Sequence, residues 1–395
     1  MKKISGDRIG TRKSLTRLMC LLVLFGNGCV ERFNIRSENF IENLVVAGHI
    51  TADLQKQQVR LSTTSYINQQ KVIPETGAQV TIKAGDGSQY EMTESAPGIY
   101  TSAPFAGKPG TTYQLLITRA NGRRYSSNDV EMRNTPAIGN VYGKYLADLP
   151  PAQRGIQLYV DAEDPTNETK FYRWEYDETY VIQTPFASNF EWLGGNEFDF
   201  RTQPVGVCYP TDSSSVVLIR STVGLSESKV TGFPLRFIDR ESYALRIKYS
   251  IQVMQYSLSE QGYTYWKTLK DINESQGTLY DKQPGTVVGN IKADGSDEVV
   301  LGYFDAAAVS SRRIFLTPQQ FEAAGYFPPG YQTSCKFLTP VIAPQAQLGV
   351  FMKQNPGYLI WDAFGLTPNA SFELLPAQCC DCTSLGTNIK PSFWE

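Results

Sequence analysis

Hydrophobic and polar residues alternate with a period of two along much of the chain after residue 43, which predicts β-strands. In the first part of this region the alternating runs are short. Asp86-Gly87 separates two of them, and Asn121-Gly122 separates two more. Such dipeptides between alternating runs are strong hairpin signals, because glycine readily adopts the positive φ of tight turns. About seven short strands over residues 44–132 predict an Ig-like or transthyretin-like β-sandwich.

A second, larger β-rich region follows residues 133–150, whose prolines and glycines are typical of a linker. Its clearest predicted strand covers residues 243–256, where one face is apolar and the other polar, as in a sheet with one wet face. Helical spacing after Ser259 predicts a helix with that serine as its N-cap. Thr317-Pro318 predicts the start of another short helix. The predicted fold class is therefore mainly β, with one or two short helices.

The N-terminal segment has the pattern of a bacterial secretion signal. A basic start is followed by an apolar run over residues 18–25 and then by Gly26-Asn27-Gly28-Cys29. The apolar run is far shorter than the roughly 20 residues that span a bilayer, and small residues before a cysteine are typical of a cleavage site that leaves an acylated cysteine. We expect palmitate or a similar chain on Cys29; an ordinary signal peptide is the alternative. The predicted organisation is a signal peptide (1–28), a lipidated tether (29–40), a β-sandwich (41–135) and a larger β-rich domain with a disulfide-stapled tail (136–395).

Composition excludes several classes of function. The sequence holds 37 Lys and Arg and 39 Asp and Glu; without residues 1–28 these become 31 and 38, a net charge near −7. This balance argues against a nucleic-acid partner. The single histidine, His49, is the only one that Ser-His-Asp or Cys-His catalysis could use, and His-rich zinc sites are excluded. We expect it to lie on the surface or on a sheet face, and we expect no cofactor.

Five cysteines follow the acylated position, and an extracytoplasmic chain favours disulfides over zinc thiolates. They are Cys208, Cys335, Cys379, Cys380 and Cys382. An odd number leaves one thiol over. The C-x-x-C formed by Cys379 and Cys382 lies in a polar tail and not at the start of a helix, which argues against redox chemistry. We expect Cys379 or Cys382 to be bridged to Cys335 or Cys208, which would hold the tail on the second domain.

Two further clusters are weaker candidates for binding. Oxygen-bearing side chains around Pro165 are a weak Ca²⁺ candidate, although they lack the spacing of an EF-hand and an acidic turn is the favoured interpretation. This cluster consists of Asp161, Glu163, Asp164, Asn167 and Glu168. Tyr172, Trp174 and Tyr176 share one face of a predicted strand. Core packing is the favoured interpretation of these rings, and a platform for ligand stacking is the alternative.

Several motifs, in this order along the chain, resemble a known family. They are Leu44-Val45-Val46, Phe171-Tyr172-Arg173-Trp174, Gln255-Tyr256-Ser257-Leu258-Ser259, Leu301-Gly302-Tyr303-Phe304 and the segment from Cys379 to Trp394. They are similar to those of the bacterial outer-membrane lipoprotein family "domain of unknown function 4249", and the resemblance covers nearly the whole mature chain. Cys380 beside Cys379 departs from the family pattern. The resemblance implies a β-rich lipoprotein of Bacteroidota outer membranes, whose gene often neighbours that of a TonB-dependent transporter, and it implies no activity.

These observations predict a non-enzymatic outer-membrane lipoprotein that is an accessory or ligand-capturing partner of a TonB-dependent barrel protein. One alternative is a hydrolase of glycans or peptides that uses carboxylates such as Glu175, Asp177 and Glu178. Carboxylates so close in sequence usually solvate a strand, which makes this alternative less favoured. A structural envelope protein is the other alternative. The sequence does not distinguish the periplasmic from the cell-surface face of the membrane.

Overall fold

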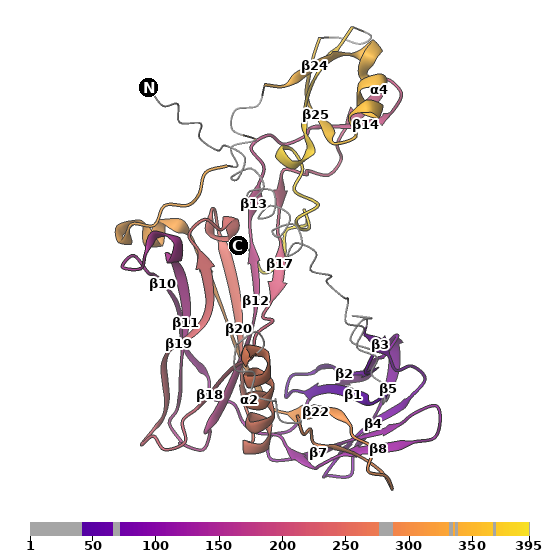
Figure 1. Ribbon diagram of the computed structural model, residues 1–395, viewed down its shortest axis with the longest axis vertical. Coiled ribbons are helices and arrows are strands. Elements are labelled where there is room, and N and C mark those ends of the chain that lie inside the picture. Colours follow the sequence, from indigo (N-terminus) through magenta and orange to yellow (C-terminus); the bar gives the residue numbers. More distant parts are fainter. Residues whose placement is uncertain are drawn as a thin grey trace, which may run out of the picture. The chain divides into compact units, whose positions relative to one another are not determined.

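A computed structural model describes residues 42–65, 72–275, 287–331, 335, 339–365 and 369–394 (Figure 1). Cys29 and the rest of the predicted signal and tether lie outside these residues. The described chain is mainly β-structure, which confirms the predicted fold class, and it forms three modules with separate hydrophobic cores. None of the described helices has the length and apolarity needed to cross a membrane.

The first module is one sheet that nearly closes on itself. Its strands are β1 (Leu44–Ile50), β2 (Gln55–Thr63), β3 (Ile73–Pro74), β4 (Gln79–Ala84), β5 (Gln89–Ala96), β6 (Ile99–Phe105), β7 (Thr112–Thr118), β8 (Arg124–Ser127), β9 (Val130–Glu131), β21 (Ile291–Ala293) and β22 (Leu301–Ala306). The main order is β21-β8-β7-β4-β5-β6-β2-β1-β22, and the two end strands contact each other. Alternate side chains, such as Leu44 and Val46 of β1, point into the core.

β21 and β22 reach the first module from far along the sequence. β22 pairs with β1 in parallel, which places Asp305 beside His49. Gly302 makes this approach possible: its φ is +105°, and a Cβ would lie 1.8 Å from the carbonyl oxygen of Val46. The buried side chain of Asn290 also binds both the N–H and the carbonyl of Phe304. These local contacts fix a strand pairing that spans most of the chain.

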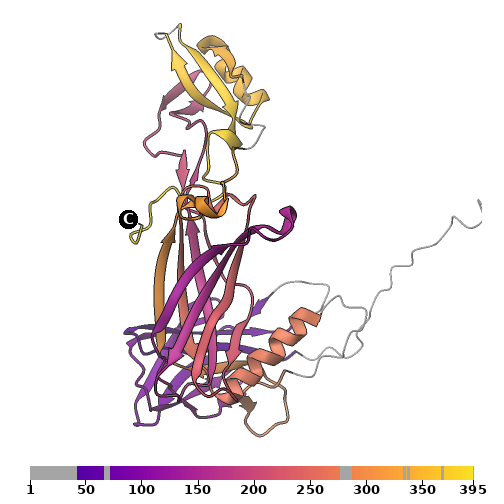
Figure 2. The ribbon, with the colours of Figure 1, turned by 90° about the vertical axis from the view of Figure 1, so that its left-hand side faces the viewer.

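The second module is a sandwich of two sheets around one core. Its strands are β10 (Ile138–Tyr145), β11 (Gly155–Asp164), β12 (Phe171–Tyr180), β17 (Thr211–Ser213), β18 (Leu218–Ser221), β19 (Ser228–Asp239), β20 (Tyr249–Ser257) and β23 (Val309–Leu316). One sheet has the order β10-β11-β19, and the other has β17-β12-β20-β23 with β18 also on β12. Figure 2 shows their long strands running side by side. Both sheets contribute to the core, for example through Leu158 and Trp174.

Two predictions for this module are wrong in part. The predicted linker, residues 133–150, contains β10, whose alternation is interrupted by a bulge between Ile138 and Val141. The predicted strand over residues 243–256 begins only at Tyr249, because a 3₁₀ turn, η2 (Tyr243–Leu245), precedes it. The alternation of apolar and polar residues does not reveal a short 3₁₀ turn, so it could not show where this strand begins.

The predicted helices are confirmed. α2 (Glu260–Ser275) follows Ser259, whose Oγ accepts a hydrogen bond of 3.0 Å from the backbone N–H of Gly262. A 3₁₀ helix, η3 (Pro318–Ala324), follows Thr317, whose N–H donates to the Gln320 side chain at 3.1 Å. Another 3₁₀ turn, η1 (Pro151–Gln153), lies between β10 and β11.

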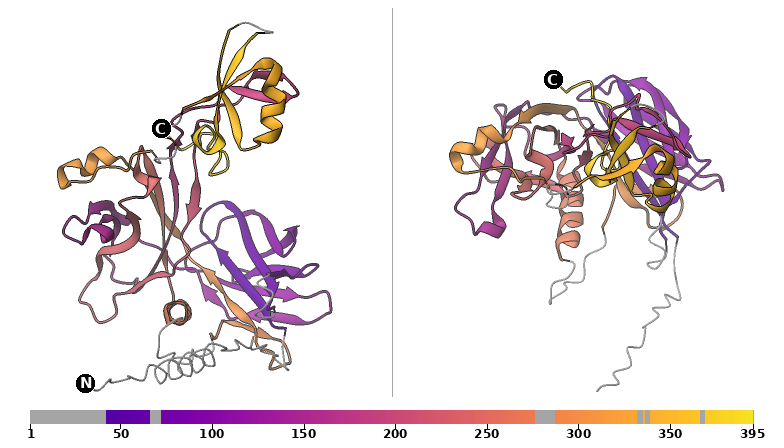
Figure 3. Two further views of the ribbon diagram at one scale, coloured as in Figure 1. Left: turned by 45° about the horizontal axis from the view of Figure 1, so that its top comes forward. Right: turned by 90° about the horizontal axis from the view of Figure 1, so that it is seen from above.

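The third module combines an excursion between β12 and β17 with the C-terminal part of the chain (Figure 3). Its elements are β13 (Ile182–Gln183), β14 (Phe190–Gly194), β15 (Glu197–Phe200), β16 (Val207–Cys208), β24 (Val341–Pro344), α4 (Gln345–Gln354), β25 (Tyr358–Phe364), β26 (Ser371–Pro376) and η4 (Ala377–Cys379). The excursion contributes Phe190 to the core, and the C-terminal part contributes Leu348 and Phe372. Neither segment encloses a core alone.

Candidate functional site

A polar cluster of buried and half-buried side chains, here called the polar joint, lies where the first module meets the second. It consists of His49 (β1), Arg173 and Glu175 (β12), Tyr256 (β20), Trp266 (α2) and Asp305 (β22). Strand pairing brings these side chains together: His49 lies opposite Asp305, and Arg173 lies opposite Tyr256. The first module thus supplies His49 and Asp305, the second module supplies Arg173, Glu175 and Tyr256, and helix α2 supplies the tryptophan.

The Arg173 guanidinium is the centre of the polar joint. Its carbon lies 4.4 Å from the ring centre of Tyr256 and 4.6 Å from that of Trp266, both within cation–π range. Glu175 accepts hydrogen bonds from the same guanidinium and from the Tyr256 hydroxyl, the latter at 2.9 Å. The His49 ring lies edge-on to the Tyr256 ring, with the two ring centres 4.9 Å apart. The joint therefore links the modules through aromatic and charged contacts.

Burial controls protonation in the polar joint. It lowers the pKa of His49 to about 3, with help from the charge of Arg173, so the imidazole is neutral at pH 7. Burial raises the pKa of Asp305. Burial also opposes ionisation of Glu175, but Arg173 and the Tyr256 hydroxyl outweigh it and lower the pKa of that carboxyl.

His49 lies on a sheet face, but both its ring nitrogens are buried. Neither ring nitrogen has a hydrogen-bond partner among the described residues. The same is true of the Arg173 Nε, the Trp266 Nε1 and one carboxylate oxygen of Asp305. Arg173 and Asp305 are not among the site residues predicted from the sequence, although Arg173 lies in a motif that carries the family resemblance. The available signal was a charged residue in a run of aromatic strand residues, Phe171-Tyr172-Arg173-Trp174.

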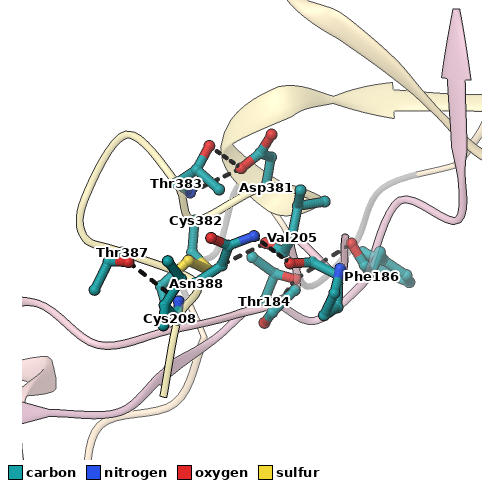
Figure 4. Close-up of a disulfide and its surroundings, with 12 residues drawn as sticks. Thr184, Phe186, Val205, Cys208, Asp381, Cys382, Thr383, Thr387 and Asn388 are labelled. Atoms are coloured by element: carbon teal, nitrogen blue, oxygen red, sulfur yellow. Dashed lines mark hydrogen bonds between the residues drawn. A yellow bond between two sulfur atoms is a disulfide. The ribbon is translucent and has the colours of Figure 1, made fainter. Parts of the chain in front are cut away.

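The C-terminal tail is held by two disulfides, which confirms the prediction that this chain forms them. Cys208 of β16 is bonded to Cys382 (Figure 4). Cys335 is bonded to Cys379. Among the cysteines that the structure describes, Cys380 is the one outside a disulfide, and it is fully buried. Burial raises the pKa of its thiol to about 12, so it is protonated at neutral pH.

Beyond the disulfides, the tail is docked by backbone and aromatic contacts. The Tyr209 N–H donates to the Thr387 carbonyl at 2.7 Å, and the Asn388 side-chain amide donates to the Pro204 carbonyl at 2.9 Å. Trp394 is buried and packs against Tyr209. The tail is therefore part of the folded structure, as its two closing aromatic residues predict.

A pocket of about 100 Å³, here called the tail pocket, lies beside both disulfides. Its lining residues are Ile182, Gln183, Thr184, Pro185, Tyr243, Arg246, Tyr331, Cys335, Gln378, Asp381, Cys382 and Leu385. The guanidinium carbon of Arg246 lies 3.3 Å from the ring centre of Tyr331. Asp381 accepts hydrogen bonds from the N–H and the hydroxyl of Thr383, at 2.7 and 2.6 Å, through one carboxylate oxygen (Figure 4).

The weak Ca²⁺ candidates are not brought together as ligands. Asp161 accepts from the Gly232 N–H, Glu163 pairs with Lys229, and Asp164 accepts from the N–H groups of Thr166 and Thr169, while Asn167 accepts from Lys170. Glu168 lines a cleft with Glu163 and Asp164. Over the described ranges, no group of three His, Cys, Asp or Glu side chains could hold a metal ion.

The aromatic residues considered for ligand stacking are in the core of the second module. Tyr172 and Trp174 are fully buried and Tyr176 is 7% exposed. Trp174 stacks on Phe233 with ring centres 4.5 Å apart, and its Nε1 donates to Gln255 at 2.9 Å. Alternation on β12 points these rings at the facing sheet, so they are not available to a ligand.

The three carboxylates of β12 each have structural partners. Glu175 belongs to the polar joint. Glu178 is 4% exposed and accepts from Tyr249 at 2.6 Å and from Arg236 at 3.0 Å. Asp177 accepts from the Ser213 hydroxyl at 2.6 Å. Glu175 and Glu178 lie on opposite faces of the strand, so they do not form a facing pair.

Comparison with known proteins adds a family. The family model described as Domain of unknown function (DUF4249) matches residues 30–313. No curated protein matches the chain. Among solved structures, the Yersinia pseudotuberculosis adhesin InvE is similar at 14% identity with a TM-score of 0.16, over 54% of this chain and 54% of the adhesin chain. This chain thus spans about half the length of that neighbour.

Proposed function

The chain belongs to the family Domain of unknown function (DUF4249), and on that premise we propose that it is a lipid-anchored, non-enzymatic protein of the outer membrane that captures a ligand for a TonB-dependent transporter. The observation that carries this proposal is the tail pocket. Two disulfides border it, and it holds an arginine and an aspartate that do not pair with each other. Disulfides persist in oxidising compartments, which fits a secreted chain.

The proposed anchor is an acyl chain on Cys29. Its support is the basic start, short apolar run and small residues before that cysteine. Partnership with a transporter is supported by the resemblance to outer-membrane lipoproteins whose genes often neighbour transporter genes.

The alternatives have less support. A carboxylate-dependent hydrolase needs an acid and a base facing one substrate, whereas Glu175 and Glu178 are engaged in structural contacts on opposite faces of β12. A purely structural envelope protein has no need of a pocket with charged side chains left for a ligand. The tail pocket therefore favours capture over either alternative.

The test is affinity purification of the full chain from its own membranes in mild detergent, after cross-linking in intact cells. We expect a TonB-dependent barrel protein to co-purify in near-equal amount. Cys29→Ser is the matched variant: it should incorporate no labelled palmitate and leave the membrane fraction. Palmitate incorporation into that variant would overturn the anchor, and the absence of any such barrel from the cross-linked complex would overturn the partnership.

A further inference from the structure

We propose that the tail pocket binds a small zwitterion, a free amino acid or a short peptide, with Arg246 receiving its carboxylate and Asp381 its ammonium group. This inference rests on the proposed capture function and names the class of ligand. It is carried by the charges, size and construction of the pocket.

Arg246 has a charge that the described residues do not neutralise. Its side chain stacks on the Tyr331 ring, and no carboxylate within the described ranges forms an ion pair with it. Stacking on one flat face leaves the N–H groups at the edge of the guanidinium free to donate. A guanidinium presents those donors in a planar fork that matches a carboxylate.

Asp381 supplies the opposite charge in the same pocket. Thr383 occupies one of its carboxylate oxygens, and the other has no protein donor among the described residues. Asp381 and Arg246 both line the pocket, yet no ion pair joins them. Two opposite charges that share a cavity without pairing suit a ligand that carries both charges.

The remaining lining fixes the size and polarity of the ligand. The pocket of about 100 Å³ is well below the roughly 300–1,000 Å³ of sites for drug-sized ligands. Ile182, Pro185 and Leu385 provide apolar walls, and the amides of Gln183 and Gln378 provide further donors and acceptors. This combination suits one or two amino-acid residues with an apolar side chain.

The disulfides make the pocket a preformed site. Cys335 and Cys382 line it, and their bonds to Cys379 and Cys208 tie together segments 44 and 174 residues apart in sequence. A site held in place before binding loses less conformational entropy when the ligand arrives. Reduction of the disulfides should therefore remove binding.

The test is isothermal titration of the full mature chain, in detergent, with L-leucine and with the dipeptide Gly-Leu. We expect at least one of them to bind, and which one binds distinguishes the free amino acid from the peptide. N-acetyl-leucine and leucinamide each lack one charge and should bind at least tenfold more weakly than leucine. The corresponding N-acetyl and amide forms of Gly-Leu serve the peptide arm.

Variants assign the roles of the two side chains. Arg246→Gln and Asp381→Asn should each weaken zwitterion binding at least tenfold, while Arg240→Gln, which changes an exposed arginine outside the pocket, should not. Circular dichroism of each variant checks its fold. No binding of either zwitterion, or unchanged affinity in folded Arg246→Gln, overturns this inference. Co-purification of the barrel protein would be unaffected by that result, so the two proposals can fail separately.

Discussion

Arg173→Met is the most informative perturbation of the polar joint, because methionine keeps an apolar stem but removes the charge. Arg173 is 6% exposed. Its loss would leave the Glu175 carboxylate without its cation and remove the guanidinium from the Tyr256 and Trp266 rings. Asp305, also buried, would lose the positive charge that favours its ionised form. We therefore expect both modules to be destabilised at their contact.

The magnitude follows from these contacts. Breaking a fully buried ion pair by removing one partner costs about 3–5 kcal/mol, and cation–π contacts contribute about 0.5–2 kcal/mol each. The Glu175 side chain is 41% exposed, so solvent screens part of the charge that would be stranded. Methionine also recovers some apolar contact. We expect a net loss of about 2–4 kcal/mol in the free energy of unfolding.

Urea denaturation monitored by tryptophan fluorescence measures this loss, since urea, unlike guanidinium chloride, does not screen charges. Arg240→Met is the matched control: its ion pair with Glu241 is exposed, and such pairs contribute about 0–1 kcal/mol. The double variant Arg173→Met/Glu175→Gln should be more stable than Arg173→Met, because the stranded carboxylate is neutralised. The reasoning is refuted if Arg173→Met and Arg240→Met lose equal stability, or if the double variant recovers none.

Two further predictions concern protonation and the tail. Burial lowers the pKa of His49 from 6.5 to about 3. Protons therefore bind the unfolded chain more readily, and the free energy of unfolding is highest above pH 6.5 and falls as the pH drops toward 3. His49→Gln should reduce the pH dependence of the unfolding free energy in that window by about 1.4 kcal/mol per pH unit, and equal slopes would contradict this. Peptide mapping without reductant should find Cys208–Cys382 and Cys335–Cys379; Cys380 should react with iodoacetamide only after denaturation, and rapid labelling of the native chain would contradict its burial.

Local patterns in the sequence determined most strands, the helix start at Ser259 and the docking of the tail. The alternating pattern identifies strands because side chains two residues apart in a strand face the same side of the sheet. Ser259 marks the start of the helix because a serine hydroxyl accepts a hydrogen bond from a backbone N–H of the first turn. These relations involve neighbours in the chain and need no tertiary structure. The cysteines also indicated disulfides, because their number and compartment restrict their chemistry.

Only the tertiary structure decided which cysteine stays free, what surrounds His49 and where β22 pairs. Cys379 and Cys380 are adjacent in sequence, and the fold alone brings one of them to Cys335. In the sequence, His49 is one residue of a predicted strand. In the fold, β22 places Asp305 beside it and the second module brings Arg173 near. Interactions between distant segments depend on packing and register, which a period of two does not specify. The interactions of each charged side chain therefore depend on the groups that the fold places opposite it.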